Sequence, residues 1–232
     1  MRRVLMAIAM MGMAGAASAE RLDHRYDLSV SGLRMASAHV VSDVTDTTYT
    51  ATARMEARGI VGLFAAEDID VTVRGTRTGP AGFAPQAFVQ TSADDRLDIA
   101  WRGGAPSSIV TDPPRPADAR KIPTLSRQQG TVDFLTAVLA LTMPGTPEEI
   151  CTRSFDSFTI TRRVRIDGQG VGGTAAAPVC TVDYSKVDPE TLAVRDPQTY
   201  RMELRPLPDG RHEVARITGP TEFGTATIAR VN

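Results

Sequence analysis

Two cysteines, Cys151 and Cys180, have the clearest chemistry in this chain of 232 residues. Two cysteines in an oxidising compartment most simply form one disulfide bond. Such a bond would close a loop of about 30 residues and stabilise the fold by roughly 3.5 kcal/mol in the chain-entropy model. A redox-active pair is the alternative, but the C-x-x-C spacing typical of such pairs is absent. We therefore expect a structural disulfide.

Three arginines, Arg162, Arg163 and Arg165, fall on a stretch that alternates like a β-strand. They are candidates for contact with an anionic ligand such as a lipid phosphate. The alternative, which we favour, is a polar strand face whose arginines pair with carboxylates on a neighbouring strand.

Four carboxylates, Asp133, Glu148, Glu149 and Asp156, cluster around the stretch that leads to the first cysteine. Paired carboxylates can perform general acid–base catalysis. The alternative is that they cap helices and face solvent, which is the more common role of acidic residues at the start of a helix.

Other signatures of catalysis or cofactor binding are weak. His24, His39 and His212 are far apart and have no cysteine or carboxylate at metal-ligand spacing, so we expect no metal site. The glycine-rich run 168–173 is not followed by a helix, as a dinucleotide-binding loop would be. The serines near Cys151 lack a G-x-S-x-G context. The sequence thus predicts a protein that is not an enzyme and has no cofactor; a hydrolase is the least supported alternative.

The first residues are typical of a cleavable export signal. Arg2 and Arg3 precede an apolar run, and a small-x-small motif ends before Glu20. The apolar run is about half of the ~20 residues that a membrane span needs, so a permanent anchor is the less favoured alternative. We expect residues 1–19 to be a signal peptide, the mature protein to be periplasmic, and no stable membrane span to remain.

The overall charge is almost balanced, with 26 basic and 27 acidic residues. A nucleic-acid-binding protein usually carries a basic patch and a high isoelectric point. We therefore expect no nucleic-acid partner.

Alternation of apolar and polar residues predicts about eleven short strands in a single β-rich domain, residues 20–232. Strands with one apolar face indicate an antiparallel curved sheet or half-barrel. The proline-rich segment 103–130 is expected to be neither strand nor helix. The candidate strands are residues 25–32, 38–44, 49–58, 68–75, 87–91, 96–103, 157–166, 179–184, 199–205, 212–218 and 223–231.

The stretch "GTVDFLTAVLAL" predicts one short helix, with Gly130 or Thr131 as its cap. A helix that is apolar nearly all round must be buried among neighbours. We expect it to pack on the curved sheet as a plug, or to cover a ligand as a lid. Its apolar residues are Phe134, Leu135, Val138, Leu139 and Leu141.

Between Tyr26 and Tyr184 the chain resembles a bacterial envelope family known as domain-of-unknown-function family 3108. The family's middle segment typically reads Gly-Thr-Leu-Asp-Pro-Leu-Ser-Ala-Leu-Leu, and Phe134 stands here where the proline is usual. Ser157 replaces the glycine that usually follows the aspartate. The resemblance implies an exported β-rich protein with no assigned activity, and it supplies no catalytic residues. The residues that carry it are Gly130, Thr131, Asp133, Leu135, Ala137, Leu139, Cys151, Asp156, Arg162, Arg163, Cys180 and Tyr184.

The plan of a curved sheet with a helical plug is also similar to that of periplasmic lipoprotein carriers, which is a likeness of fold alone. From these features we expect a non-enzymatic periplasmic protein that binds an apolar or amphipathic envelope molecule, either a lipid or the acyl chain of a lipoprotein. The alternative is a structural or assembly protein of the cell envelope that acts through its surface, with another envelope protein as its partner.

Overall fold

A computed structural model describes residues 19–58, 68–79, 82–114 and 122–231. The expected signal peptide, apart from Ala19, lies outside the described residues. All strands of the described residues belong to one sheet, in the order β7-β6-β5-β4-β3-β2-β1-β14-β13-β12-β11-β10-β9-β8. The strands are β1 (Glu20–Val30), β2 (Leu33–Val44), β3 (Thr48–Ala57), β4 (Ile69–Arg77), β5 (Phe83–Thr91), β6 (Arg96–Arg102), β7 (Ala105–Asp112), β8 (Thr131–Val132), β9 (Ser154–Thr159), β10 (Arg162–Thr174), β11 (Ala177–Val187), β12 (Val194–Pro206), β13 (His212–Thr221) and β14 (Gly224–Val231).

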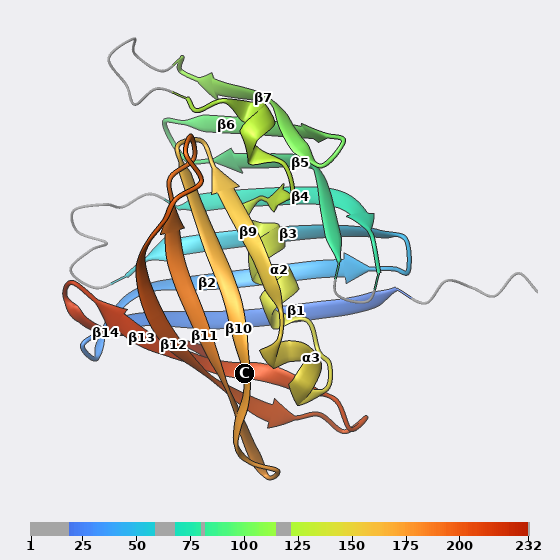
Figure 1. Cartoon of the computed structure of the whole chain (residues 1–232), viewed down its shortest axis with the longest axis vertical. Helices are drawn as coiled ribbons and strands as arrows, with labels where there is room; N and C mark the ends of the chain where they lie inside the picture. Colours follow the sequence, from blue (N-terminus) through green and yellow to red (C-terminus); the bar gives the residue numbers. More distant parts are fainter. Residues whose placement is uncertain (1–18, 59–67, 80–81, 115–121, 232) are drawn as a thin grey trace, which may run out of the picture.

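The sheet curls into a nearly closed barrel with two walls. Figure 1 shows the first wall, β1–β7, crossing behind the second wall, β9–β14, with helix α2 (Phe134–Thr142) between them. The walls are continuous because β1 pairs with β14 along the sheet. At the other side the edge strands are β7 and β8, and backbone Gly130 donates to the carbonyl of Gly104 across that gap at 2.8 Å. The predicted class, a mainly β curved sheet with one apolar helix, is confirmed.

The strand count is higher than the eleven predicted. The candidate 157–166 is two strands, β9 and β10, because the chain turns at Ile160, whose φ is 42°. Alternation cannot reveal such a turn, since the residues on either side keep the period of a strand. The short strand β8 was also missed.

The proline-rich segment 103–130 was wrongly predicted to lack regular structure. It contains β7 and the 3-10 helix η1 (Leu125–Gln128), while residues 115–121 lie outside the described part of the chain. Pro106 is tolerated because β7 is an edge strand that pairs only with β6, and an edge strand has backbone positions that need no donor.

Helix α2 begins later than predicted. Its cap is Asp133, not Gly130 or Thr131, and the Asp133 side chain accepts a hydrogen bond from the Thr136 backbone N–H at 2.8 Å. A second short helix, α3 (Pro147–Cys151), begins with a capping box in which Thr146 and Glu149 bond each other's backbone N–H groups.

The buried apolar side chains of the described residues form two core clusters. The larger joins α2 to strands of the first wall and includes Tyr49, Val73, Phe88, Leu135 and Leu139. The smaller joins α3 to the second wall and is made of Ile150, Cys151, Cys180, Val182, Met202, Leu204 and Val214. No helix in the described residues is long and apolar enough to cross a membrane.

Candidate ligand-binding site

Helix α2 is fixed to the first wall by a buried polar chain. The Thr136 hydroxyl donates to Asp133 at 2.6 Å and lies 2.8 Å from the Tyr49 hydroxyl. Burial raises the pKa of the Asp133 carboxyl to about 6, although the bonds from Thr136 act in the opposite direction. Burial also raises the pKa of Tyr49, and the nearby Asp133 carboxylate adds to the shift. These contacts set the depth at which the helix sits.

The predicted plug residues do not all have the same environment. Leu135 and Leu139 are buried in the larger core cluster, which is the position that a plug requires. Leu141 packs against the smaller cluster, and Val138 is half-buried. Phe134, at the first turn, keeps 46% of its surface exposed.

The helix covers only one end of the inner sheet face. It packs where β1 begins, beside Tyr49, Ala51 and Ala53, which we call the helix end of the barrel. On the same face of β3, Met55 and Ala57 are only half-buried. These residues lie toward the opposite end, where β1 ends and β2 begins, which we call the hollow end.

A row of apolar side chains crosses the inner face at the hollow end. Ladder pairing places its members side by side: Met202, Ile217, Ile228, Leu28 and Ala36. Ile217 packs against the smaller core cluster, which shows that the row faces inward. Nevertheless Ile228 is 38% exposed, and Leu28 and Ala36 are half-buried. We refer to these five residues as the apolar row.

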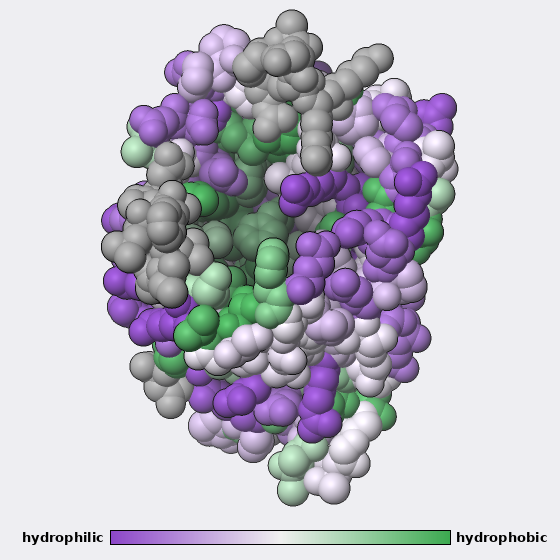
Figure 2. All heavy atoms as spheres, turned by 90° about the vertical axis from the view of Figure 1, so that its left-hand side faces the viewer, coloured by the Kyte–Doolittle hydropathy of each residue, from purple (hydrophilic) through white to green (hydrophobic). Residues whose placement is uncertain are grey.

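The surface view confirms that this end is hollowed. Figure 2 looks at the molecule from the left of Figure 1 and shows a hollow with hydrophobic walls between hydrophilic rims. Inward-facing apolar residues that stay exposed indicate a space that the chain's own side chains do not fill.

A polar layer lies deeper than the apolar row. The Glu213 carboxylate, 4% exposed, accepts from Arg205 Nε at 2.5 Å and is paired with Arg230. Tyr26 lies on this layer too, with its hydroxyl 3.0 Å from His24 Nδ1. Burial, followed by the charges of Arg230 and Arg205, lowers the pKa of His24 to about 4, so this imidazole is neutral at pH 7.

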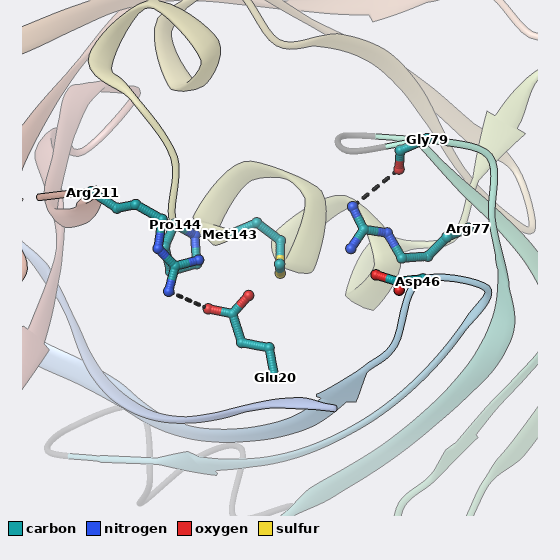
Figure 3. Close-up of a pocket in the computed structure, with 7 residues that line it drawn as sticks. All are labelled: Glu20, Asp46, Arg77, Gly79, Met143, Pro144 and Arg211. Carbon is teal, nitrogen blue, oxygen red and sulfur yellow. Dashed lines mark hydrogen bonds and ion pairs between the residues drawn. The ribbon is translucent and has the colours of Figure 1, made fainter. Parts of the chain in front are cut away.

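A second hollow, of about 410 Å³, opens at the helix end. Its lining combines Glu20, Asp46, Arg77 and Arg211 with Met143 and Pro144, the residues that follow α2. Figure 3 shows Arg211 reaching Glu20, which it contacts at 2.8 Å. Arg77 donates to the Gly79 carbonyl at 3.0 Å and lies over the Phe83 ring. The charged side chains of this pocket, and the Arg211–Glu20 ion pair within it, distinguish it from the apolar row.

The arginines on β10 are held by an internal carboxylate. Arg163 and Arg165 both donate to Asp156, from Nε atoms at 2.8 Å, and the ladder pairs Arg165 directly with Asp156. Arg163, which is buried, also donates to the carbonyl of Arg127. The structure thus shows the carboxylate pairing that we favoured for these two residues, while Arg162 is exposed.

The structure also shows where the cysteines and the other carboxylates singled out from the sequence lie. Cys151 and Cys180 lie at disulfide-bonding distance, with Cα atoms 4.9 Å apart, and they link α3 to β11. Asp133 and Glu149 cap helices, and Glu148 lies in the first turn of α3. Within the described ranges, no group of three or more His, Cys, Asp or Glu is placed to hold a metal ion.

Sequence reasoning missed the apolar row and the polar layer. Neighbours in the row come from five different strands, so their proximity depends on strand register. One signal was present: Arg230 occupies the apolar phase of β14, two residues after Ile228. A charge in that phase must face the interior.

Comparison with known proteins adds no relative. No family model, no curated protein and no solved structure matches the chain significantly. The resemblance to domain-of-unknown-function family 3108 therefore stays a prediction.

Proposed function

We propose that this chain is a non-enzymatic periplasmic protein that binds an apolar or amphipathic envelope molecule, such as a lipid or a lipoprotein acyl chain, in the hollow end of its barrel. The observation that carries the proposal is the exposure of Ile228 and the partial exposure of Leu28 and Ala36, three members of the apolar row on the inner face of the sheet. Concave apolar surface of this kind is typical of small-molecule sites.

The placement of α2 explains why the space exists. Helix α2 runs across the strands of the first wall (Figure 1), so the length of strand that it covers is set by its diameter, about 10–12 Å with side chains. The ten residues of β3 extend about 33 Å. The helix therefore covers Tyr49, Ala51 and Ala53 and leaves the inner face beside Met55 and Ala57 for another occupant.

Titration with N-phenyl-1-naphthylamine, an uncharged apolar fluorophore, tests the proposal. We expect saturable binding, and we expect Ile228→Asp to weaken the affinity at least about tenfold, equivalent to ~1.4 kcal/mol. The matched control is Thr227→Asp, because the ladder pairs Thr227 with Ser29 and Thr218 on the outer face of the same strand. That variant should bind like the wild type.

Absence of saturable binding to the folded wild type would overturn the proposal. In that case a structural or assembly role at the cell envelope, exerted through the outer surface, becomes the better hypothesis. Equal weakening by Ile228→Asp and Thr227→Asp would also contradict the hollow end as the binding site.

A further inference from the structure

Two turns stand at the mouth of the hollow end. The first joins β1 to β2 and ends at Leu33, and the second, residues 221–224, joins β13 to β14. Val30, two residues beyond the apolar row on β1, pairs with Leu33 and with Ala226, so Leu33 continues the inner face up to the mouth. Figure 1 shows the two turns side by side at its left, the side from which Figure 2 views the hollow. We call residues 31–33 and 221–224 the mouth turns.

The mouth turns carry exposed apolar side chains. Phe223 is 82% exposed and Leu33 is 62% exposed, which are the highest fractions among the large apolar residues that the structure describes. Single exposed apolar residues are ordinary on a protein surface. Two of them on adjacent turns, at the mouth of an apolar hollow, indicate a contact with something outside the chain.

Hydrogen bonds hold the two turns together and satisfy polar groups at their tips. Ser31 donates from its backbone N–H to the Thr225 carbonyl and from its hydroxyl to the Phe223 carbonyl, both at 2.9 Å. Within the second turn, the Thr221 hydroxyl accepts from the Phe223 N–H at 3.2 Å and donates to the Gly224 carbonyl at 2.8 Å. An unpaired backbone group is costly in a lipid environment. Turns that are paired in this way can therefore enter the surface of a bilayer at low cost.

Size and charge favour a lipid surface over a protein as the partner. A stable protein interface buries about 800 Å² of each partner, whereas a large aromatic side chain contributes at most about 250 Å². Two such side chains fall short of that area, but a bilayer takes up individual apolar side chains at its headgroup boundary. The mouth turns contain no basic residue and one acidic residue, Glu222, while Arg34, which follows the first turn, is paired with Asp27. This composition fits a zwitterionic surface better than an anionic one.

We propose that the mouth turns dock the barrel on a zwitterionic lipid surface, with Phe223 and Leu33 inserted at the level of the headgroups and the mouth of the hollow facing the bilayer. This inference rests on the proposed function and adds to it the surface from which the hollow receives its envelope molecule. An apolar ligand then passes between the bilayer and the apolar row without crossing open water.

Flotation of the protein with vesicles of phosphatidylcholine tests the inference. We expect the wild type to float with the vesicles and Phe223→Ser to lower its partition coefficient at least about tenfold, because the variant loses the apolar area of the aromatic ring. Leu33→Ser should also lower the partition coefficient. Added salt should leave the binding of the wild type unchanged, since insertion of apolar side chains is not screened by ions.

Val110→Ser is the matched control. Val110 is 58% exposed, which is close to the fraction for Leu33. It lies on the edge strand β7, where the ladder pairs it with Asp98 on the outer face, whereas β1 and β14 are in the middle of the sheet. This variant should float as the wild type does. Circular dichroism checks that each variant is folded, and the wild-type result decides the question even if one variant is not.

A wild type that does not float with phosphatidylcholine vesicles, or a Phe223→Ser variant that floats equally well, would overturn the inference. Binding only to vesicles that contain anionic phosphatidylglycerol, lost when salt is added, would also overturn it, because the contact would then be electrostatic. In each case saturable binding of N-phenyl-1-naphthylamine without vesicles leaves the proposed function standing. Absence of that binding would instead overturn the proposed function, so the two failures are distinguishable.

Discussion

The two ends of the barrel differ in what occupies the inner sheet face. At the helix end, Tyr49, Ala51 and Ala53 of β3 are buried under α2. At the hollow end, Met55 and Ala57 continue the same face of the same strand but are half-buried. The same inner face of β3 continues through both ends, so the difference is due to the helix, which crosses the strand at one end only (Figure 1).

The polar groups of the two ends also differ. The pocket at the helix end contains acidic and basic side chains in equal number, and Arg211 pairs there with both Glu20 and Asp209. In the layer beneath the hollow, Arg205 and Arg230 both contact the Glu213 carboxylate, which is 4% exposed. An ion pair that stays open to water, such as that of Arg211 with Glu20, contributes little to stability, whereas a buried carboxylate depends on its arginine partners.

The largest expected effect is a contrast between the two ends in stability. Leu139→Ala removes a buried side chain of the helix and should lower the free energy of unfolding by roughly 2–5 kcal/mol. Met55→Ala, at the hollow end, should lower it by about 1 kcal/mol or less. Urea unfolding at pH 7 measures both values.

For ligand affinity we expect the opposite order, with the larger loss in Met55→Ala and the smaller loss in Leu139→Ala. Met55→Ala removes a wall of the hollow and should weaken the binding of N-phenyl-1-naphthylamine, whereas folded Leu139→Ala should bind it as the wild type does. Similar losses of stability in the two variants would show that the hollow end is packed as tightly as the helix end.

The sequence was sufficient for much of the fold. The period-two alternation identified the strands from β1 to β6 and from β11 to β14, and the all-round apolarity of the stretch after Asp133 identified the plug helix. These properties are local, so they do not depend on which strands are neighbours. The disulfide partners also followed from the sequence, since it contains only two cysteines.

The candidate site could not be predicted, because it depends on register. Ile228 and Leu28 are 200 residues apart in the chain and become neighbours only when β14 pairs with β1. The same holds for Arg230 and Glu213, whose contact depends on the pairing of β13 with β14 and on the β-bulge in the pairing of β12 with β13. The local sequence pattern indicates on which face of the sheet a side chain lies. It does not indicate which residue lies beside it on the neighbouring strand.

A smaller effect is expected from pH at the helix end. Asp133 has a pKa raised from 3.8 to about 6 by burial, so the folded state binds an extra proton between about pH 4 and pH 6. Stability should therefore fall as pH rises through this window, by at most about 3 kcal/mol for a shift of this size. Asp133→Asn keeps an oxygen for the helix cap and removes the titration.

The difference in unfolding free energy between wild type and Asp133→Asn isolates this contribution, because His24 and the other titrating groups are common to both proteins. We expect the wild type to lose stability relative to the variant between pH 4 and pH 7, as measured by urea unfolding at each pH. If the unfolding free energies of the two proteins instead changed with pH in parallel, the Asp133 carboxyl would titrate in the folded state as it does in the unfolded chain.

The smallest effect is expected in the pocket at the helix end. Arg211→Ala removes the ion pairs with Glu20 and Asp209, but Arg211 is 41% exposed, and ion pairs of this kind contribute about 0–1 kcal/mol. The variant should unfold at nearly the same urea concentration as the wild type and should bind N-phenyl-1-naphthylamine equally well. If Arg211→Ala instead weakened the binding of the fluorophore as much as Ile228→Asp does, the fluorophore would have to lie in the polar pocket at the helix end and not along the apolar row.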